Sequence, residues 1–549
     1  MKTLAGVVLF VLSVQAQPAS KQTEVDRIFA AFNNHTPGCA VGVAHQGSVV
    51  LKAGYGMADL ERNVTITPDT IFESGSVAKQ FTAAALMLLA QQGKISLDDP
   101  VRKYLTELPD YGKPLTIRHV LSHVSGLREW RPIATFGGRP EGTYVLGNQD
   151  LLQMAAQQRA LNFDPGTNYS YTNTGFNIST ILIERVLNGG TSAGTTFQAF
   201  THDNIFGPLG MDHTRWRDDF RTVVPNRALA YGRTNSSGEA WVQQTPIENI
   251  IGAGGLLTTV GDLLLWNENF THAKVGGPEM VKAQQTPVTL TASAGNPART
   301  ITYAAGLAVT TVSGIREVSH SGSTGGYRTW LGRYPDQAVS VAVLCNSAQA
   351  NPTSLGRDTA RLWTGAAPPK ALASTYAADA AKLQALAGMY RKLRDNTVTE
   401  VRWRDGKLTM DRTELFAVAA NQFVAAAERQ VHFEDGPPIR MRVITPDADI
   451  LYERVEASQP TAVEIAALAG AYESRETGAT LTFAAGAKPG EMTYRIGATT
   501  PVSLKPTFRD AFTAPSGEAF HFLRDAAGKV TALSIGEDRV WDLRFTRVK

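Results

Sequence analysis

The sequence predicts an α+β domain followed by two small all-β modules. Helix-like and strand-like patterns alternate over residues 17–365, and an Ala- and Pro-rich break follows at 365–382. Short alternating segments separated by Gly, Asp and Pro make up the rest. At 549 residues the chain is too long for one ordinary core, and a prior of about 150 residues per domain gives roughly three domains.

The N-terminus has the pattern of a secretory signal. Lys2 supplies a positive charge, residues 4–14 are nearly all apolar, and small residues precede Gln17. We predict a signal peptide at 1–16, cleaved after Ala16, and a periplasmic or secreted protein. An uncleaved anchor is the alternative, but the apolar run is shorter than the roughly 20 residues that span a bilayer. No other segment is apolar enough, so we expect no stable membrane insertion.

The first domain, predicted at 17–370, contains recognisable strands and helices. Residues 39–56 predict two strands around a turn at Gln46 and Gly47. Residues 76–93 predict a helix that is apolar on nearly all sides and is therefore buried. Further patterns predict helices at 148–158, 175–188 and 259–268 and a buried strand at 338–346. This mixture fits α+β or α/β layers.

The C-terminal part repeats itself. "LAGMY" at 386–390 returns 82 residues later as "LAGAY", and the two copies end alike in "LYERV" and "LRFTRV". The repeat predicts two antiparallel β-barrel modules of about eight strands each, at 371–458 and 459–549. One larger sheet with a chance match is the alternative, which is disfavoured because both ends of the unit recur.

Charge and composition exclude several classes of partner. The formal net charge is +3 with no basic run, so we expect no nucleic acid. The two cysteines, Cys39 and Cys345, cannot build a metal or redox cluster. His119 and His123 are four residues apart, but no H-E-x-x-H motif and no third ligand accompany them. We predict no metal and no cofactor.

Ser76 and Lys79 are the first candidate catalytic pair. They lie one turn apart at the start of the predicted helix, where the helix N-terminus favours a developing negative charge. Burial would keep the lysine neutral enough to accept the serine proton. An S-x-x-K pair alone is weak, because Ser76 would serve equally well as a helix cap and Lys79 as a solvated side chain.

Two further motifs follow in order. Tyr171-Thr172-Asn173 lies 95 residues after Ser76, and His320-Ser321-Gly322 lies 149 residues after Tyr171. With S-x-x-K they resemble the motif set of the serine penicillin-recognising enzymes. Blocks such as "GAGGLLTTVGDLLLW" and "YPDQAVSVAVLCN" extend the resemblance over residues 25–350. The chain is similar to the class C β-lactamase-like hydrolases, closest to their D-aminopeptidase-like branch.

This resemblance implies a fold and a set of roles. The fold is a five-stranded antiparallel sheet flanked by helices, with a helical lobe, and the D-aminopeptidase-like branch adds two lipocalin-like barrels. Ser76 would attack the substrate carbonyl, while Lys79 and Tyr171 would share the general-base work. Asn173 would hold the substrate amide and orient Lys79.

The third motif would complete the site. The backbone N–H groups of Ser76 and Ser323 would form the oxyanion hole, and Gly322 would line the substrate subsite. His320 would lie at the substrate's polar end and support Tyr171. Taken singly, Tyr171 could be a core aromatic residue and His320 a turn residue; taken jointly and in order, the catalytic interpretation is favoured.

His320 also bears on the substrate. Many relatives have lysine there, a fixed cation for a substrate carboxylate, whereas histidine is largely neutral at pH 7. We therefore predict a serine hydrolase of small amides, peptides or esters. A β-lactamase or DD-carboxypeptidase is the same-class alternative, and a slowly deacylating penicillin- or peptidoglycan-binding protein is the alternative of another class. The sequence leaves homo-oligomer formation open.

The resemblance also bears on the cysteines. It places the first and last strands of the sheet side by side, which would bring Cys39 near Cys345. A disulfide is allowed, but adjacent strands demand strict geometry. We expect free, packed thiols.

Overall fold

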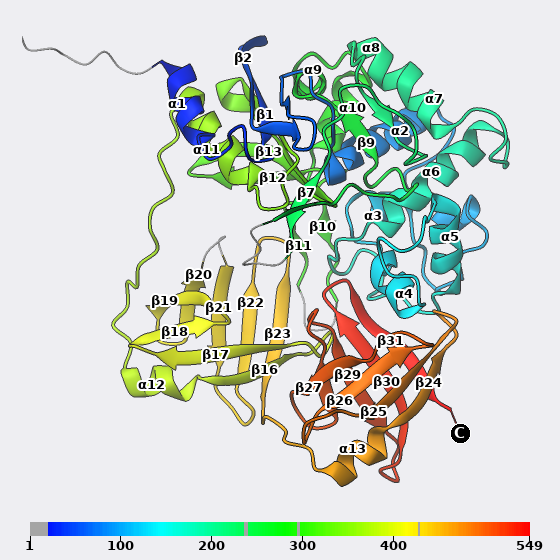
Figure 1. The fold of residues 1–549 in the computed structure, drawn as a ribbon, viewed down its shortest axis with the longest axis vertical. Coiled ribbons are helices and arrows are strands. Elements are labelled where there is room, and N and C mark those ends of the chain that lie inside the picture. Colours follow the sequence, from blue (N-terminus) through cyan, green and yellow to red (C-terminus); the bar gives the residue numbers. More distant parts are fainter. Residues whose placement is uncertain (1–19, 235–239, 294–296, 426–428, 549) are drawn as a thin grey trace, which may run out of the picture.

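The computed structural model describes residues 20–234, 240–293, 297–425 and 429–548. The predicted signal peptide at 1–16 lies outside these residues. Within them, no helix is both long and apolar enough to cross a membrane. Figure 1 shows the mixed first domain above two barrels that lie side by side beneath it.

One antiparallel sheet organises the first domain. Its strand order is β12-β13-β14-β15-β1-β2, so it has six strands rather than the expected five. The edge strand β12 joins β13 through a tight turn at Ser313 and Gly314, both with positive φ. The strands are β1 (Cys39–His45), β2 (Ser48–Tyr55), β12 (Ala308–Val312), β13 (Ile315–Thr324), β14 (Tyr327–Tyr334) and β15 (Val339–Cys345).

A disulfide joins the first and last strands of this sheet. β1 pairs with β15, and the register places Cys39 directly opposite Cys345, with their Cα atoms 4.0 Å apart. The prediction of free thiols was therefore wrong. Strand adjacency followed from the resemblance, but the register that aligns the two cysteines has no signature in the sequence.

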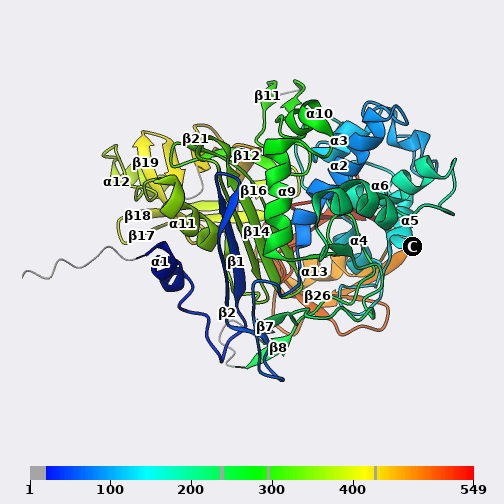
Figure 2. The same cartoon turned by 90° about the horizontal axis from the view of Figure 1, so that it is seen from above.

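Helices cover both faces of the sheet (Figure 2). On one face lie α1 (Lys21–Ile28) and α11 (Pro352–Thr364), where Gly356 lets the helix backbone approach Trp330. On the other face α9 (Val260–His272) packs against β1, with Leu264 over Gly42. The sequence predictions of this helix and of β1, β2 and β15 agree with the structure to within a few residues.

The helical lobe lies beyond α9. The predicted apolar helix is α2 (Lys79–Gln91), whose residues are buried from Lys79 to Leu89. The other helices of the lobe are α3 (Ile117–Leu121), α4 (Trp130–Phe136), α5 (Asn148–Gln157), α6 (Thr174–Leu187), α7 (Phe197–Thr201), α8 (Gly207–Leu209) and α10 (Gly277–Gln284).

The repeat corresponds to two closed barrels of eight antiparallel strands each, as predicted. The first contains β16 (Gly388–Lys392), β17 (Val398–Arg404), β18 (Lys407–Met410), β19 (Thr413–Ala419), β20 (Gln422–Ala425), β21 (Arg429–Glu434), β22 (Arg440–Ile444) and β23 (Asp449–Val455). The second contains β24 (Gly470–Ser474), β25 (Ala479–Ala485), β26 (Met492–Ile496), β27 (Val502–Pro506), β28 (Ala511–Thr513), β29 (Ala519–Arg524), β30 (Val530–Glu537) and β31 (Val540–Arg547).

The recurring pentapeptide has the same structural role in both barrels. A short helix, α12 (Ala380–Ala385) or α13 (Ala462–Leu468), precedes it. The tyrosine hydroxyl that ends each copy donates to the carbonyl of the leucine that begins it, at 2.7 Å in both. The repeat is thus a local unit that fixes the entry into each barrel.

The second barrel shares its core with the helical lobe. Phe136 of α4 lies 5.8 Å from Phe520 and 6.4 Å from Tyr494, measured between ring centroids. A buried ion pair joins Arg128 of the lobe to Glu476 of the barrel at 2.5 Å. Because an unpaired charge buried here would be costly, this contact fixes the barrel against the lobe.

Candidate active site

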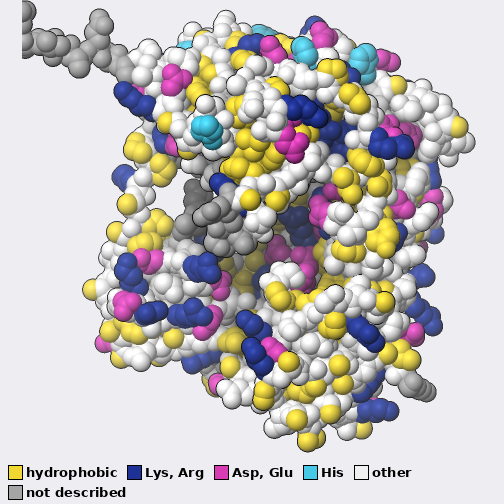
Figure 3. Space-filling model, in the orientation of Figure 1, with side chains coloured by type: hydrophobic (Ala, Val, Ile, Leu, Met, Phe, Trp, Pro, Cys, Tyr) yellow, Lys and Arg dark blue, Asp and Glu magenta, His cyan; other side chains and the backbone are white. Residues whose placement is uncertain are grey.

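A cavity of about 890 Å³ opens between the end of the sheet and the helical lobe. Figure 3 shows a hollow between the first domain and the barrels, in which acidic and basic side chains lie together. The cavity brings together six of the seven residues predicted from the sequence motifs, which are Ser76, Tyr171, Asn173, His320, Gly322 and Ser323. The seventh, Lys79, is completely buried behind Ser76.

A short strand positions the turn that carries Ser76 at the cavity. β5 (Phe72–Glu73) pairs with β9 (Leu256–Thr258), which also pairs with β6 (Arg215–Trp216). The chain then forms a 3₁₀ turn over Gly75–Ala78 before α2 begins at Lys79, three residues later than predicted. The tighter turn leaves Ser76 partly exposed while its neighbours are buried.

Lys79 is held by three oxygen atoms. Its Nζ lies 3.0 Å from Ser76 Oγ, 2.7 Å from Asn173 Oδ1 and 2.9 Å from the carbonyl oxygen of Ala253. Burial lowers the pKa of Lys79 well below its usual value. A neutral amine has two N–H groups for the two carbonyl oxygens and one lone pair for the Ser76 hydroxyl proton. This arrangement suits a general base.

Glu129, which the sequence motifs do not include, fixes the orientation of Asn173. Its buried carboxylate accepts from the Asn173 backbone N–H at 2.6 Å and from Asn173 Nδ2 at 2.8 Å. With Nδ2 bound there, Oδ1 must face Lys79. The only hint in the sequence is that Glu129 directly follows the block "SHVSGLR", and no spacing rule connects it to Asn173.

Tyr171 lies in an aromatic environment beside Ser76. Burial raises the pKa of its phenol, whereas a hydrogen bond with Ser76 and the charge of Arg539 lower it. The imidazole of His123 packs 4.1 Å from the phenol ring between centroids. His123 Nδ1 accepts from the backbone N–H of Thr172 at 3.2 Å, so this histidine holds the Tyr171 loop in place.

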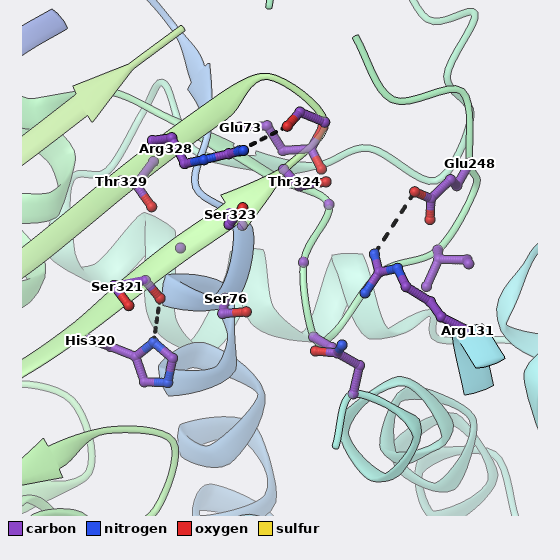
Figure 4. Close-up of a pocket in the computed structure, with 18 of the residues that line it drawn as sticks. Glu73, Ser76, Arg131, Glu248, His320, Ser321, Ser323, Thr324, Arg328 and Thr329 are labelled. Atoms are coloured by element: carbon purple, nitrogen blue, oxygen red, sulfur yellow. Dashed lines mark hydrogen bonds and ion pairs between the residues drawn. The ribbon is translucent and has the colours of Figure 1, made fainter. Parts of the chain in front are cut away.

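β13 approaches the Ser76 turn so closely that only glycine fits on either side. A Cβ on Gly322 would lie 2.1 Å from the Ser74 carbonyl oxygen, and one on Gly75 would lie 2.6 Å from the Ser323 backbone nitrogen. Thr329 Oγ1 donates to the same Ser74 oxygen at 2.6 Å. Figure 4 shows Ser323 and Ser76 on these two facing elements.

Both ring nitrogens of His320 form hydrogen bonds with other groups of the protein. Nδ1 lies 2.6 Å from the carbonyl oxygen of Ser321, as Figure 4 shows, and Nε2 lies 2.8 Å from the hydroxyl of Tyr303. With Nδ1–H donating to the carbonyl, Nε2 accepts from the tyrosine. Burial, followed by the charge of Lys79, lowers the pKa of His320 to about 3. Tyr303, which no motif includes, therefore belongs to this wall of the site.

Most other charges in the cavity are paired. Arg217 donates to Glu73 at 2.9 Å in a fully buried ion pair beneath the Ser76 turn. Arg131 lies 3.2 Å from Glu141. It also lies 4.0 Å from Glu248, and Figure 4 shows this second contact. Burial raises the pKa of Glu248 to about 7.

The last hairpin of each barrel reaches this region. Between β22 and β23, Asp447 Oδ1 accepts from the backbone N–H of Thr302 at 2.6 Å, next to Tyr303. Between β30 and β31, the carbonyl of Arg539 accepts from Asn162 Nδ2 at 2.8 Å, and its guanidinium lies 4.9 Å from the Tyr171 ring centroid. The sequence gives no sign of either contact.

His119 and His123, which are four residues apart, face different partners, and only His119 lies in a helix, α3. His119 Nδ1 accepts from the backbone N–H of Thr116 at 3.2 Å, whereas His123 faces Tyr171 and Thr172. In the described part of the chain, no three His, Cys, Asp or Glu side chains are grouped so that they could hold a metal ion.

Comparison with known proteins agrees with the fold and the motifs. The β-lactamase family model matches residues 25–366, more than half of the chain. A D-aminopeptidase of Gluconobacter oxydans (strain 621H) is 30% identical over 317 residues, which are 57% of this chain and 56% of that relative. The chain therefore spans little more than half the length of this curated relative.

Two solved structures share the fold. The octameric penicillin-binding protein homologue from Pyrococcus abyssi has a TM-score of 0.56 at 23% identity, over 79% of this chain and 99% of that one. A D-stereospecific amidohydrolase from Streptomyces sp. has a TM-score of 0.50 at 19% identity, over 62% of this chain and 97% of that one. The family model, the ordered motifs and the fold agree: this chain belongs to the β-lactamase family.

Proposed function

We propose that this protein is an exported serine hydrolase that cleaves a small amide, peptide or ester through an acyl-enzyme on Ser76. The observation that carries the proposal is the contact between Ser76 Oγ and Lys79 Nζ, 3.0 Å long and buried on the lysine side. A serine hydroxyl needs an adjacent base to become a nucleophile, and a lysine acts as that base only when its pKa is lowered. Both conditions are met here.

The first half of the reaction forms the acyl-enzyme. Ser76 Oγ bonds to the substrate carbonyl carbon while its proton passes to Lys79, with Tyr171 beside them. The backbone N–H groups of Ser76 and Ser323 receive the negative charge on the carbonyl oxygen. When the tetrahedral intermediate collapses, the bond to the leaving amine or alcohol breaks, and the leaving group takes up the proton.

The second half releases the acyl group. Water gives a proton to the same base and attacks the ester carbonyl carbon. Ser76 Oγ then leaves and recovers its proton, so the enzyme is regenerated and one water is consumed. Asn173, oriented by Glu129, holds Lys79 and the substrate amide throughout.

Three observations support the substrate class and the location. The D-aminopeptidase and the D-stereospecific amidohydrolase to which the chain is similar favour small amides or peptides containing a D-residue. The neutral His320 favours them over β-lactams, which relatives anchor with a lysine. Disulfides such as the one between Cys39 and Cys345 form and persist in oxidising compartments outside the cytosol, which supports export.

The test combines turnover with intact mass. On a panel of D- and L-aminoacyl anilides, short esters and a cephalosporin, Ser76→Ala should lose about 10⁴-fold or more in kcat, as with other serine nucleophiles. Ser48→Ala, an exposed serine on β2, is the matched control and should behave as the native protein. Incubation with a penicillin or ester should add an acyl mass to the native chain only. Full activity in Ser76→Ala would contradict the mechanism.

A further inference from the structure

Arg539 occupies an unusual position for a residue of a C-terminal barrel. Its backbone makes the structural contacts, because its carbonyl accepts from Asn162 Nδ2 and the next residue but one, Trp541, donates its N–H to Asn162 Oδ1 at 3.0 Å. Its side chain lines the same cavity as Ser76 and lies over the ring of Tyr171. The guanidinium therefore contributes to the site rather than to the attachment of the barrel.

The carboxylates nearest to Arg539 in the chain are engaged elsewhere. Glu537 Oε1 accepts from the Arg539 backbone N–H at 2.9 Å. Asp538 pairs with Arg394 of the first barrel at 2.5 Å. Among all residues that the structure describes, no carboxylate lies within ion-pair distance of the Arg539 guanidinium, and no acceptor takes a hydrogen bond from it.

The other cations of the cavity each have a polar partner within the protein. Arg217 is neutralised by Glu73, and Arg131 lies among three glutamates. Arg328, at the β13–β14 turn, gives Nη1 to the carbonyls of Gly325 and Tyr327 at 2.8 Å each. His320 is held neutral between Ser321 and Tyr303. Arg539 is thus the cation beside Tyr171 that retains its full capacity for hydrogen bonds.

We propose that Arg539 forms an anion subsite in which the second barrel binds a carboxylate of the substrate next to the scissile bond. A guanidinium offers two parallel N–H donors to a carboxylate, and the partly buried setting strengthens such a charge-assisted pair. Related enzymes with a lysine at the position of His320 have a positive charge there. In this protein Arg539 of the second barrel would supply the positive charge instead. This inference rests on the proposed function and names its substrate class: small amides or esters that carry a negative charge.

The test uses probes that differ only in a carboxylate. N-succinyl-D-alanine anilide is compared with its N-succinamoyl analogue, and D-alanine 4-carboxyanilide with the 4-carbamoylanilide, so that the charge lies on the acyl or on the leaving side. Binding is measured by calorimetry in the Ser76→Ala background, which does not depend on turnover. We expect one charged probe to bind at least tenfold more tightly than its neutral analogue, less so at high salt.

Variants at Arg539 assign that preference. In the Ser76→Ala background, Arg539→Gln should abolish the charged-to-neutral ratio, and Arg539→Lys should keep part of it. Arg509→Gln is the matched control, because Arg509 lies on the same barrel with a side chain that is 89% exposed. In the enzyme with Ser76 restored, Arg539→Gln should raise KM for the charged probe at least tenfold more than for its analogue.

The outcomes separate the two proposals. Equal binding of charged and neutral probes on both sides, or a ratio that survives Arg539→Gln, would overturn the anion subsite. So would an equal loss on charged and neutral substrates, which would assign Arg539 to Tyr171 or to the fold. Tight, Arg539-dependent binding without any Ser76-dependent turnover would leave the subsite standing and contradict the hydrolase.

Discussion

At the scale of single residues, the site depends on one carboxylate that takes no part in the motifs. Glu129 accepts two hydrogen bonds from Asn173 and one from the hydroxyl of Thr172. Burial lowers the pKa of Lys79, and the negative charge of Glu129 opposes that effect by raising it. Glu129 is thus a positioning residue that sets both the geometry and the basicity of the proposed base.

Glu129→Gln should separate these two effects. Replacing the carboxylate with an amide leaves Asn173 without one acceptor, so kcat/KM should fall about tenfold to a hundredfold, as expected for a charge-assisted hydrogen bond. Loss of the negative charge lowers the pKa of Lys79 further, so the acidic limb of the pH profile should move to lower pH. Stopped assays over pH 4–10 measure both.

If Glu129 had only a structural role, Glu129→Gln would lower the rate without shifting the acidic limb of the pH profile. Glu61→Gln, an exposed glutamate on a loop, is the control and should leave the profile unchanged. A limb that moves to higher pH would contradict the assigned electrostatics.

At the scale of elements, the site is the junction of a strand with a turn. β13 passes the Ser76 turn at a distance that Gly322 and Gly75 alone permit, and this contact sets where the Ser323 backbone N–H lies. The proposed oxyanion hole therefore depends on the spacing of two backbone segments rather than on any side chain.

Gly322→Ala should open this junction. The new Cβ would meet the Ser74 carbonyl oxygen at 2.1 Å and Thr329 Oγ1 at 2.2 Å, so β13 must shift away. We expect a loss of stability of about 1–3 kcal/mol from overpacking and a fall in kcat of about a hundredfold from misplaced donors. Thermal unfolding and steady-state kinetics test this.

Gly261→Ala is the matched control for Gly322→Ala. Gly261 lies in α9, where the nearest atom to a new Cβ is 3.7 Å away, so activity should be retained and stability unchanged or slightly improved. Full activity in Gly322→Ala would contradict the close approach described here.

The sequence predicted the elements better than their contacts. Hydrophobic patterns located α2, α5, α6, α9 and the strands β1, β2 and β15, because burial imposes a period that a single segment displays. They did not locate β12, β13 or β14 of the same sheet. The ordered motifs selected six residues that the structure brings to one cavity and a seventh, Lys79, that lies buried next to Ser76. Glu129 and Tyr303 could not be found this way. Their partners, Asn173 and His320, lie 44 and 17 residues further along the chain, and neither spacing belongs to a recognisable motif.

At the scale of the whole molecule, the disulfide closes a loop of most of the first domain. Cys39 and Cys345 are separated by 306 residues and connect the strand that begins the sheet with the strand that completes it. Everything between them, including the motifs, folds within this loop. The bond therefore restricts the unfolded chain strongly.

Removal of the disulfide should destabilise the first domain. We expect Cys39→Ala/Cys345→Ala to lose about 2–5 kcal/mol of unfolding free energy in urea, because loop-closure entropy returns to the unfolded state. The native protein measured in reducing agent should match the variant, which is the internal control. Thiol titration of the denatured, unreduced chain should find no free thiol, and two thiols would contradict the bond.

The two barrels repeat one unit, yet their last hairpins make different contacts. In the first barrel, Asp447 accepts a hydrogen bond from Thr302, next to Tyr303. In the second barrel, the last hairpin places Arg539 beside Tyr171. The repeat thus places two separate hairpin tips around one proposed reaction centre. A substitution at a hairpin tip can change the substrate preference without changing the geometry of Ser76 and Lys79. The same tips are therefore suitable positions for engineering new specificities.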